Sequence, residues 1–368
     1  MKQQTSGATE TQTKGSQIMD FRGKIIYVGI DVHLKDWQVA KVHDGLCLGN
    51  HRMGANSNRL IEHLQSHYPG ATFKCVYESC AWGFTLLRQL KAAGMECIVV
   101  NAADVSSSDK EKRRKTDKVD ALKLARHYAS GDLKAIHVPA EDIQKDRNLV
   151  RFRKRLVGDL NRSRNRIKSL LKYQGIDIPD QFCKAHWSRN FLNWVEQIGH
   201  QQVEIGNTLL LMLEEVKLLR QLLLKAEKQL GAMMATGKYK AQFELLLSVP
   251  GIGRTIASLY VLEIGDIKRF KTFDQLCDFI GLCPDSADSG ETERCRGITT
   301  RRHKQLRSNL IEAAWQAIRI DPALLERYQE LTKRMKGSRA IISIARKLLR
   351  RIRSVWLSGV CYQKGIIA

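Results

Sequence analysis

The chain has 368 residues, with 61 Lys and Arg against 38 Asp and Glu and a formal net charge of +23. That length predicts two or three domains, and a composition of 43% hydrophobic residues excludes a wholly disordered chain. The longest stretch free of charged side chains, His63–Phe73, is shorter than the roughly 20 apolar residues of a membrane span. The charge favours a polyanionic partner, nucleic acid above all, and the alternative is a merely basic protein.

The first residues and the cysteines indicate the compartment. Residues 1–22 are rich in Gln, Thr, Ser and Gly and have no apolar segment of the kind found in a secretion signal, so we expect a disordered tail. The nine cysteines are scattered and form no C-x-x-C pair. This pattern predicts reduced, mostly buried thiols and a cytoplasmic protein.

Residues 23–138 alternate between strand and helix patterns and predict an α/β domain. Apolar or alternating runs predict four strands, and helical spacing predicts three helices. The expected strands are Lys24–Asp31, Trp37–Val42, Thr72–Tyr77 and Met95–Val100, and the expected helices are Asn58–His67, Ala81–Ala93 and Thr116–Ser130.

Residues 139–237 repeat apolar side chains at spacings of three and four, which predicts long helices folded back on each other as a coiled-coil-like arm. The first of these helices is strongly basic, because Lys145–Lys172 contains only two acids, Asp146 and Asp159. A solvated helix face is the ordinary reading of such a run. Because nearly all the charges in this segment are positive, nucleic acid binding is the favoured interpretation.

Residues 238–368 predict a third, mainly helical domain. Within Ser248–Ala257, the Pro-Gly-x-Gly turn predicts a helix-hairpin-helix whose backbone N–H groups face a DNA phosphate, or else a plain interhelical turn. The segment Lys333–Arg353 contains no acid, and its apolar residues fall on one helical face.

Four acids are candidate metal ligands. Asp31 and Glu78 each end a predicted strand, while Asp117 and Asp120 share one face of a helix that Thr116 is expected to cap. Taken singly, they read as turn formers or ordinary helix-start residues. Together they could hold divalent cations that assist phosphodiester displacement.

A polar segment, Asp285–Thr300, is expected to be a loop and contains Ser286, Ser289, Arg294 and Arg296. A serine hydroxyl could attack phosphorus while the arginines neutralise the developing charge. A glycine-containing surface loop is the structural alternative.

Several motifs resemble bacterial insertion-sequence transposases related to the Piv DNA invertase, a group that includes recombinases guided by a bridge RNA. In the first domain they resemble its RuvC-like "DEDD" domain, and in the last its serine transposase domain. The matching segments are Tyr27–Asp31, Tyr77–Glu78, Lys115–Ala121, Leu124–Arg126, Gly131–Leu133, Gly281–Pro284, Ser289–Gly290, Gly297–Thr299 and Leu306–Ala314. They follow the family's order over most of the chain.

Two segments depart from the family pattern. The family usually has Lys and Gly shortly after its I-T pair, whereas this chain has Thr300–His303. After Glu78 the chain reads Ser79–Gly83, where many members have a small residue, Thr or Pro, and Gly. The first difference puts the role of the family lysine in doubt, and the second alters the turn beside the carboxylate.

The resemblance implies an RNase H-like domain over residues 23–138, a helical arm over 139–237 and a transposase domain over 238–368. It implies that Asp31, Glu78, Asp117 and Asp120 bind Mg²⁺ or Mn²⁺ and that Ser289, with Ser286 in reserve, forms a covalent link to DNA. It further implies donor and target DNA, a guide RNA, and a dimer or tetramer whose active sites combine protomers.

Three other functions remain open from the sequence. The first is a metal-dependent nuclease or junction resolvase in which water attacks the phosphate and Ser289 is structural. The second is a nucleic-acid-binding scaffold without activity. The third is a site-specific invertase in which the protein alone recognises the DNA.

Overall fold

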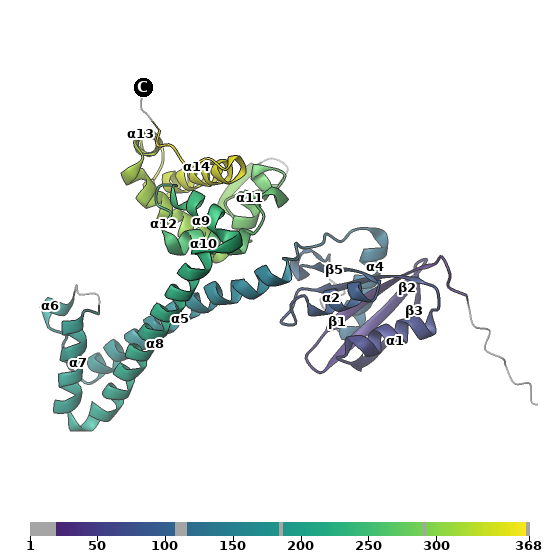
Figure 1. Cartoon of the computed structure of the whole chain (residues 1–368), viewed down its shortest axis with the longest axis horizontal. Helices are drawn as coiled ribbons and strands as arrows, with labels where there is room; N and C mark the ends of the chain where they lie inside the picture. Colours follow the sequence, from purple (N-terminus) through teal and green to yellow (C-terminus); the bar gives the residue numbers. More distant parts are fainter. Residues whose placement is uncertain (1–19, 107–115, 184–186, 290–291, 366–368) are drawn as a thin grey trace, which may run out of the picture. The chain divides into compact units, whose positions relative to one another are not determined.

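The computed structural model describes residues 20–106, 116–183, 187–289 and 292–365, and side chains within these ranges except at 183, 203, 284–289 and 292–297. Most of the expected tail lies outside these residues, as do residues 107–115. The chain divides into two compact units, Met1–Val138 and Pro139–Ala368 (Figure 1). No helix among the described residues is long and apolar enough to span a bilayer.

A five-stranded mixed sheet forms the centre of the first unit. Its strand order is β3-β2-β1-β4-β5; β1 pairs antiparallel with β2, and β2 with β3, while β1, β4 and β5 are parallel. This arrangement is compatible with an RNase H-like domain. The strands are β1 (Ile25–Val32), β2 (Asp36–His43), β3 (Leu46–Gly54), β4 (Thr72–Glu78) and β5 (Glu96–Val100).

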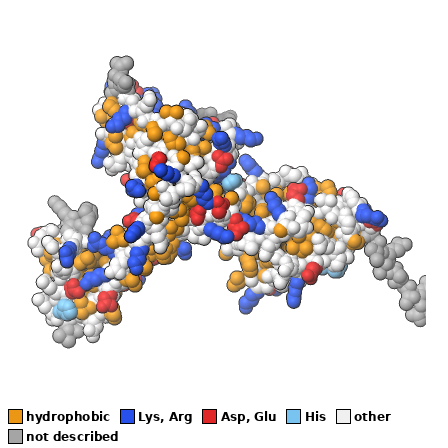
Figure 2. Space-filling model, in the orientation of Figure 1, with side chains coloured by type: hydrophobic (Ala, Val, Ile, Leu, Met, Phe, Trp, Pro, Cys, Tyr) orange, Lys and Arg blue, Asp and Glu red, His pale blue; other side chains and the backbone are white. Residues whose placement is uncertain are grey.

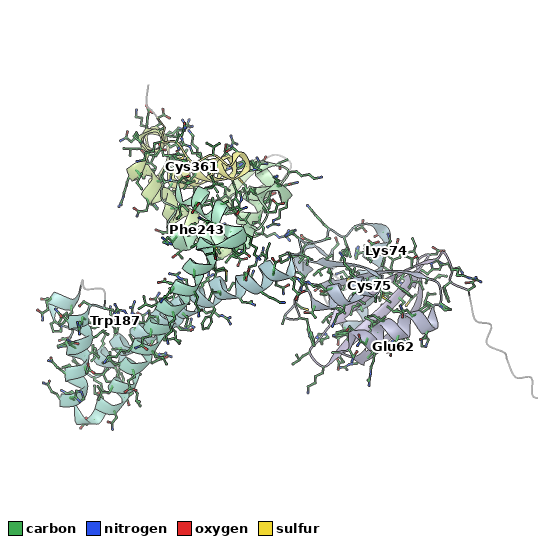
Figure 3. All side chains as sticks on the ribbon, in the orientation of Figure 1. Glu62, Lys74, Cys75, Trp187, Phe243 and Cys361 are labelled. Atoms are coloured by element: carbon green, nitrogen blue, oxygen red, sulfur yellow. The ribbon has the colours of Figure 1, made fainter. Side chains whose placement is uncertain are left out.

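Helices cover both faces of this sheet. Leucines of α1 (Ser57–His67) and α2 (Thr85–Ala92) pack against buried side chains of β1 such as Ile30. Helix α4 (Asp117–Ser130) packs on the opposite face, where Leu124 joins a separate apolar cluster. Cys75 of β4, labelled in Figure 3, faces the α1 side and is buried. Apolar residues on both faces explain why the central strands read as nearly continuous hydrophobic runs.

The sequence interpretation of this unit needs three corrections. Strand β3 was not expected, because Leu46–Gly54 lacks a regular apolar alternation, has no fully buried residue and pairs only at the edge of the sheet. Helix α2 begins at Thr85 rather than Ala81, because the residues just before it form turns. The cysteines are not mostly buried: of the seven described in the whole chain, all free, only three are buried.

Two long helices run antiparallel in the second unit, as the spacing predicts. Ser163 and Arg166 of α5 bond to Glu215 of α8, whereas Arg153, earlier in α5, bonds to Glu227, later in α8. A shorter helix packs beside α8 (Figure 1). The helices are α5 (Glu141–Tyr173), α6 (Asp180–Cys183), α7 (Arg189–Gln201) and α8 (Val203–Ala235).

The rest of this unit is mainly helical and shares one core with the ends of α5 and α8, to which Val150, Leu230 and Met234 contribute. The predicted loop over residues 285–300 is wrong, because a two-stranded antiparallel hairpin occupies most of it. Its polar strands lack the apolar alternation that signals a half-buried strand. The elements are α9 (Lys240–Leu247), α10 (Arg254–Ile264), α11 (Phe273–Ile280), β6 (Pro284–Ser289), β7 (Thr292–Ile298), α12 (Lys304–Ile320), α13 (Pro322–Thr332) and α14 (Gly337–Ser358).

Candidate active site

The first turn of α4 is built by its cap. Thr116 is extended (φ −141°, ψ 150°), and its Oγ1 accepts a hydrogen bond from the Val119 N–H at 3.4 Å, as the sequence predicts. This bond satisfies one of the free N–H groups at the helix start. Asp117 and Asp120 therefore lie in the first turn, where the helix dipole favours negative charge.

Gly29 brings this helix onto β1. A Cβ atom at position 29 would lie 2.0 Å from the Ala121 carbonyl oxygen and 2.6 Å from the Ala125 nitrogen, so only glycine allows this approach. Side chains two residues apart on a strand point to the same face. Asp31 therefore emerges on the face that α4 covers.

His33 joins two of the predicted carboxylates. Its Nε2 atom lies 3.1 Å from Asp31 Oδ2 and 3.6 Å from Asp117 Oδ1. One ligand atom from each of the three residues lies within 4.8 Å of the others. The side chains are 23% exposed for Asp31, 53% for Asp117 and 50% for His33, so a solvated ion has access to them.

The pKa of Asp31 lies above its ordinary value. Burial is the main cause, and the negative charges of Asp117 and Asp120 add to it, while His33 acts in the opposite direction. A group of crowded carboxylates is stabilised by a bound cation. Two carboxylates and one imidazole are donors that a divalent metal accepts, so these residues fit such an ion.

The other two predicted ligands lie beside this cluster rather than in it. Asp120 is close enough to raise the pKa of Asp31. Strand β4 runs parallel to β1, and its Tyr77 pairs with Ile30 of β1. The next residue of β4, Glu78, therefore lies at the level of Asp31. Val76 packs with Leu124 of α4, and the alternation of the strand turns Glu78 to the same face.

Sequence reasoning missed His33. The available signal was its position two residues after Asp31, at the exit of the same strand. That spacing returns a side chain to the same face only if the extended backbone continues past Asp31, and β1 does continue to Val32.

The predicted nucleophile belongs to the second unit. Ser289 ends β6 and its backbone pairs with Thr292, while Ser286 pairs with Cys295. The side chains of both serines, and those of Arg294 and Arg296, lie outside the described part of the structure.

The segment for which the sequence predicts a helix-hairpin-helix or a plain interhelical turn forms α9, a turn and α10. Gly251 in the turn has a φ of +80°, and a Cβ there would lie 2.2 Å from the carbonyl oxygen of Ala313 in α12. Gly253 precedes α10, and no side chain caps the helix. The turn therefore packs on α12 and leaves N–H groups of α10 for an acceptor such as phosphate.

Part of the basic character of α5 serves packing within the second unit. Arg151 forms a two-pronged ion pair with Glu263 of α10 at 2.7 and 2.8 Å, and Arg153 pairs with Glu227. Lys154 and Arg155 have no carboxylate partner among the described side chains. Lys and Arg side chains are scattered over the visible face of both units (Figure 2). The prediction that α5 binds nucleic acid therefore depends on cations without a carboxylate partner, such as these two.

Two family models match the chain. A model described as "Transposase", for the DEDD transposases of the IS110 type, matches residues 28–174, and one described as "Transposase IS116/IS110/IS902 family" matches residues 243–329. The chain belongs to the IS110/IS116 transposase family. The first match includes Asp31, Glu78, Asp117 and Asp120, and the second includes Ser289. As a member of this family, the protein is a DNA-cutting and rejoining enzyme, and its DEDD domain indicates dependence on a divalent metal.

Related proteins match most of the length of the transposase. The match with the protein y4qE of Sinorhizobium fredii covers 82% of this chain and 74% of y4qE, with 28% identity. The match with the transposase for insertion sequence element IS1533 of Leptospira borgpetersenii covers 79% of this chain and 85% of that transposase, with 24% identity. The match with the pilin gene-inverting protein of Moraxella bovis covers 64% of each chain, with 26% identity.

Proposed function

We propose that this transposase moves an insertion sequence by cutting and rejoining DNA with two sets of residues, a carboxylate site and a serine. The proposal is carried by one observation: oxygens of Asp31 and Asp117 converge with His33 within 4.8 Å at the end of β1. Carboxylates gathered on a strand end and a helix start are costly without a cation.

The metal ligands in this proposal are Asp31, Asp117, Asp120 and Glu78, with His33 as a further donor. Mg²⁺ or Mn²⁺ held there supplies charge stabilisation at a phosphodiester. The chain's own part is to fix the ligands: the cap at Thr116 and the close packing at Gly29 hold Asp117 and Asp31 in place. Calorimetric titration with Mn²⁺ tests this step, because Asp117→Asn should weaken binding and unchanged affinity would reject the site.

Ser289 is the proposed nucleophile. Its Oγ forms a bond to phosphorus as its proton leaves, and the bond from phosphorus to one deoxyribose oxygen breaks, with a proton ending on that oxygen. The phosphoserine–DNA link keeps the ester bond, so rejoining needs no high-energy cofactor. Its position in a segment that matches the family model supports the assignment.

A covalent adduct tests the serine. Denaturing electrophoresis of wild type with labelled substrate DNA should show a protein–DNA band, Ser286→Ala should retain it, and Ser289→Ala should lose it. Strand exchange that persists in Ser289→Ala with Ser286 intact would reject Ser289 as the nucleophile.

We further propose that each active site draws its carboxylates and its serine from different protomers of a dimer or tetramer. Mixing Asp117→Asn with Ser289→Ala protein tests this directly. If the residues come from different protomers, the mixture regains activity that neither variant has alone. Failure to regain it after the subunits have exchanged would contradict the shared site.

The same proposal includes a guide RNA that pairs with donor and target DNA. The net charge of +23 is compatible with such a partner. Sequencing of the nucleic acid that copurifies with the protein should recover one discrete RNA. Full activity on naked DNA without RNA would remove the guide and leave recognition to the protein.

Two alternatives keep the metal site but change the chemistry. In a nuclease or junction resolvase, water replaces Ser289 as the nucleophile, and no covalent adduct forms. In an invertase without RNA, the products are inverted segments; the similarity to the pilin gene-inverting protein favours this as the second candidate. Product analysis on substrates with paired sites separates the two.

A further inference from the structure

The outer face of α14 borders two hollows that adjoin each other. One has a volume of about 440 Å³ and lies between α13, α14 and Phe273 at the start of α11. The other has a volume of about 580 Å³ and lies at the connection from α13 to α14. Arg334 and Met335 line both, so the two hollows form one groove within the second unit, here called the α13–α14 groove.

The groove has an uncompensated positive charge. Two of its cations are paired, Arg327 with Glu330 at 2.6 Å and Arg346 with Asp274 at 3.1 Å. Among the described side chains, no carboxylate pairs with the remaining cations that line the groove, which are Arg334, Lys336, Arg339, Lys347 and Arg350. Helix α14 itself contains no acid, so the free charge lies along one line rather than in scattered pairs.

The spacing along α14 explains why these groups share one surface. Arg339, Ser343, Lys347 and Arg350 are separated by four, four and three residues, which places them on one side of a helix. The opposite side is buried in the core through residues such as Ile344. The basic side is therefore fixed by the same packing that holds the helix.

The floor of the groove is apolar. Leu331 is 4% exposed, Met335 is half-buried, and the ring of Phe273 lies 4.7 Å from the Arg350 guanidinium carbon. A duplex presents its sugar–phosphate surface and needs no apolar hollow for that contact. A single strand presents phosphates together with unpaired bases, which suit cations beside an apolar floor.

We propose that the α13–α14 groove binds a single-stranded segment of nucleic acid. Arg334, Arg339 and Lys347 contact the phosphates, and the bases enter the hollow over Met335. The site goes beyond the proposed strand chemistry and depends on neither Ser289 nor the carboxylates. DNA and RNA share the chemistry that it recognises, and the experiment distinguishes them.

Fluorescence anisotropy with the full chain tests the groove, using labelled dT₂₀, rU₂₀ and a 20-base-pair duplex over a range of salt. The variant Arg334→Ala/Arg339→Ala/Lys347→Ala should bind single strands about tenfold or more weakly. The slope of log K against log salt should become shallower by about 2, because each lost phosphate contact contributes about 0.7. The tighter of dT₂₀ and rU₂₀ identifies the natural strand.

A matched control removes the same charge elsewhere. Lys225→Ala/Lys228→Ala/Arg319→Ala changes three exposed cations outside the groove and should alter single-strand affinity less than about twofold. Equal losses in the two triple variants would overturn the proposal, since they would show general charge attraction.

Ser343→Trp tests the hollow without a change of charge. Ser343 is exposed and lines the groove, so an indole there should fill it and leave the fold intact. Single-strand affinity should fall while duplex affinity stays unchanged. Unchanged single-strand affinity in Ser343→Trp would overturn the proposal, and DNA cleavage by the carboxylate site can be measured separately in the same protein.

Discussion

The two units differ in whether their buried or crowded acids have neighbouring cations and hydrogen-bond donors that neutralise them. In the second unit, Asp321 is fully buried and accepts hydrogen bonds from Arg351 Nη1 at 3.0 Å, from the Leu324 N–H at 3.2 Å and from the Tyr362 hydroxyl. In the first unit, Asp31 lies beside Asp117 and Asp120 with His33 as the neighbouring base. One acid is fully compensated by the fold, and the other is not.

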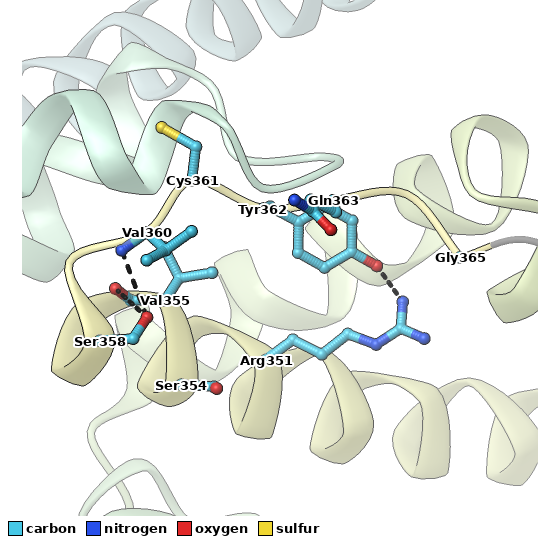
Figure 4. Close-up of a pocket in the computed structure, with 9 residues that line it drawn as sticks. All are labelled: Arg351, Ser354, Val355, Ser358, Val360, Cys361, Tyr362, Gln363 and Gly365. Carbon is cyan, nitrogen blue, oxygen red and sulfur yellow. Dashed lines mark hydrogen bonds between the residues drawn. The ribbon is translucent and has the colours of Figure 1, made fainter.

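Figure 4 shows what the compensated acid holds in place. Tyr362, in the segment after α14, lies against Arg351, and both bond to Asp321. The backbone N–H of Tyr362 also donates to Ser248 Oγ at 2.8 Å, at the turn before α10. Tyr362 therefore joins the C-terminal segment both to Asp321 and to the turn between α9 and α10. The contrast teaches that compensated acids here are structural, whereas the uncompensated set is the one available to an external cation.

The largest expected effect follows from the uncompensated set. Asp117→Asn removes a negative ligand and should lower the rate of DNA strand cleavage about a thousandfold or more, since cation stabilisation of the transition state is worth several kcal/mol. Its melting temperature should stay unchanged or rise, because the substitution relieves repulsion with Asp31. Cleavage of labelled DNA and a thermal melt measure the two quantities.

Glu62→Gln is the matched control for this variant. It makes the same chemical change on α1, which packs on the opposite face of the sheet, at an exposed position. Cleavage by Glu62→Gln should equal that of wild type. If Asp117→Asn cleaves DNA as fast as Glu62→Gln, the cluster at β1 is not the metal site.

The compensated acid should show the reverse pattern. Asp321→Ala leaves Arg351 without its anion and removes the cap at Leu324, so we expect a loss of about 3 kcal/mol in the free energy of unfolding. Urea denaturation of the full chain measures it, with the exposed Glu326→Ala on the same helix as the control. Equal stability of the two variants would show that the buried network contributes nothing.

The sequence predicted the carboxylates of the candidate metal site, but it did not predict which residues neutralise the buried Asp321. Asp31, Glu78 and Asp117 stand at ends of elements, where apolar periodicity stops, and local patterns of that kind are visible in one chain. The partners of Asp321 come from α14 and from the segment after it, and Arg351 is one basic residue among many in Lys333–Arg353. Nothing local distinguishes the arginine that pairs from those that face the groove.

The hairpin and the edge strand were missed for a related physical reason. No residue of β3 is fully buried, and the sequences of β3 and of the β6–β7 hairpin are rich in polar residues, so neither shows the apolar alternation that marks a strand. Their backbone hydrogen bonds depend on a partner strand rather than on side-chain type. The central strands and α4 were predictable because each must bury a face, and the Gly29 contact with α4 was not, because it joins residues distant in sequence.

A second acid with close cationic partners, Glu263, extends the comparison to the pH dependence of stability. Burial alone would raise the pKa of Glu263, but hydrogen bonds and charges from Arg151 and His303 outweigh it and set the value to about 2. Because the folded pKa lies below the unfolded one, the stabilisation is complete above about pH 4.5 and is lost as the pH falls towards 2. Glu263→Gln should therefore reduce stability by about 2 kcal/mol at pH 7.

Urea denaturation at pH 7, 5 and 3.5 tests the sign of this linkage. The difference between wild type and Glu263→Gln should be constant from pH 7 to pH 5 and smaller at pH 3.5. Glu214→Gln, an exposed acid on α8, provides the baseline. A difference that grows as the pH falls would mean that the carboxylate is not stabilised by its partners.

The smallest effect concerns the link between the helix cap and the carboxylate cluster. Thr116→Ala removes the Oγ1 acceptor of the Val119 N–H and should cost the start of α4 about 1 kcal/mol. Hydrogen exchange at Val119 should speed up about fivefold, which is that energy expressed as a local opening constant. Cleavage should fall by a similar factor because Asp117 and Asp120 then belong to a frayed turn. Thr116→Ser restores a hydroxyl acceptor and should recover both quantities; if Thr116→Ala and Thr116→Ser cleave DNA equally, the cap stabilises the helix without positioning the carboxylates.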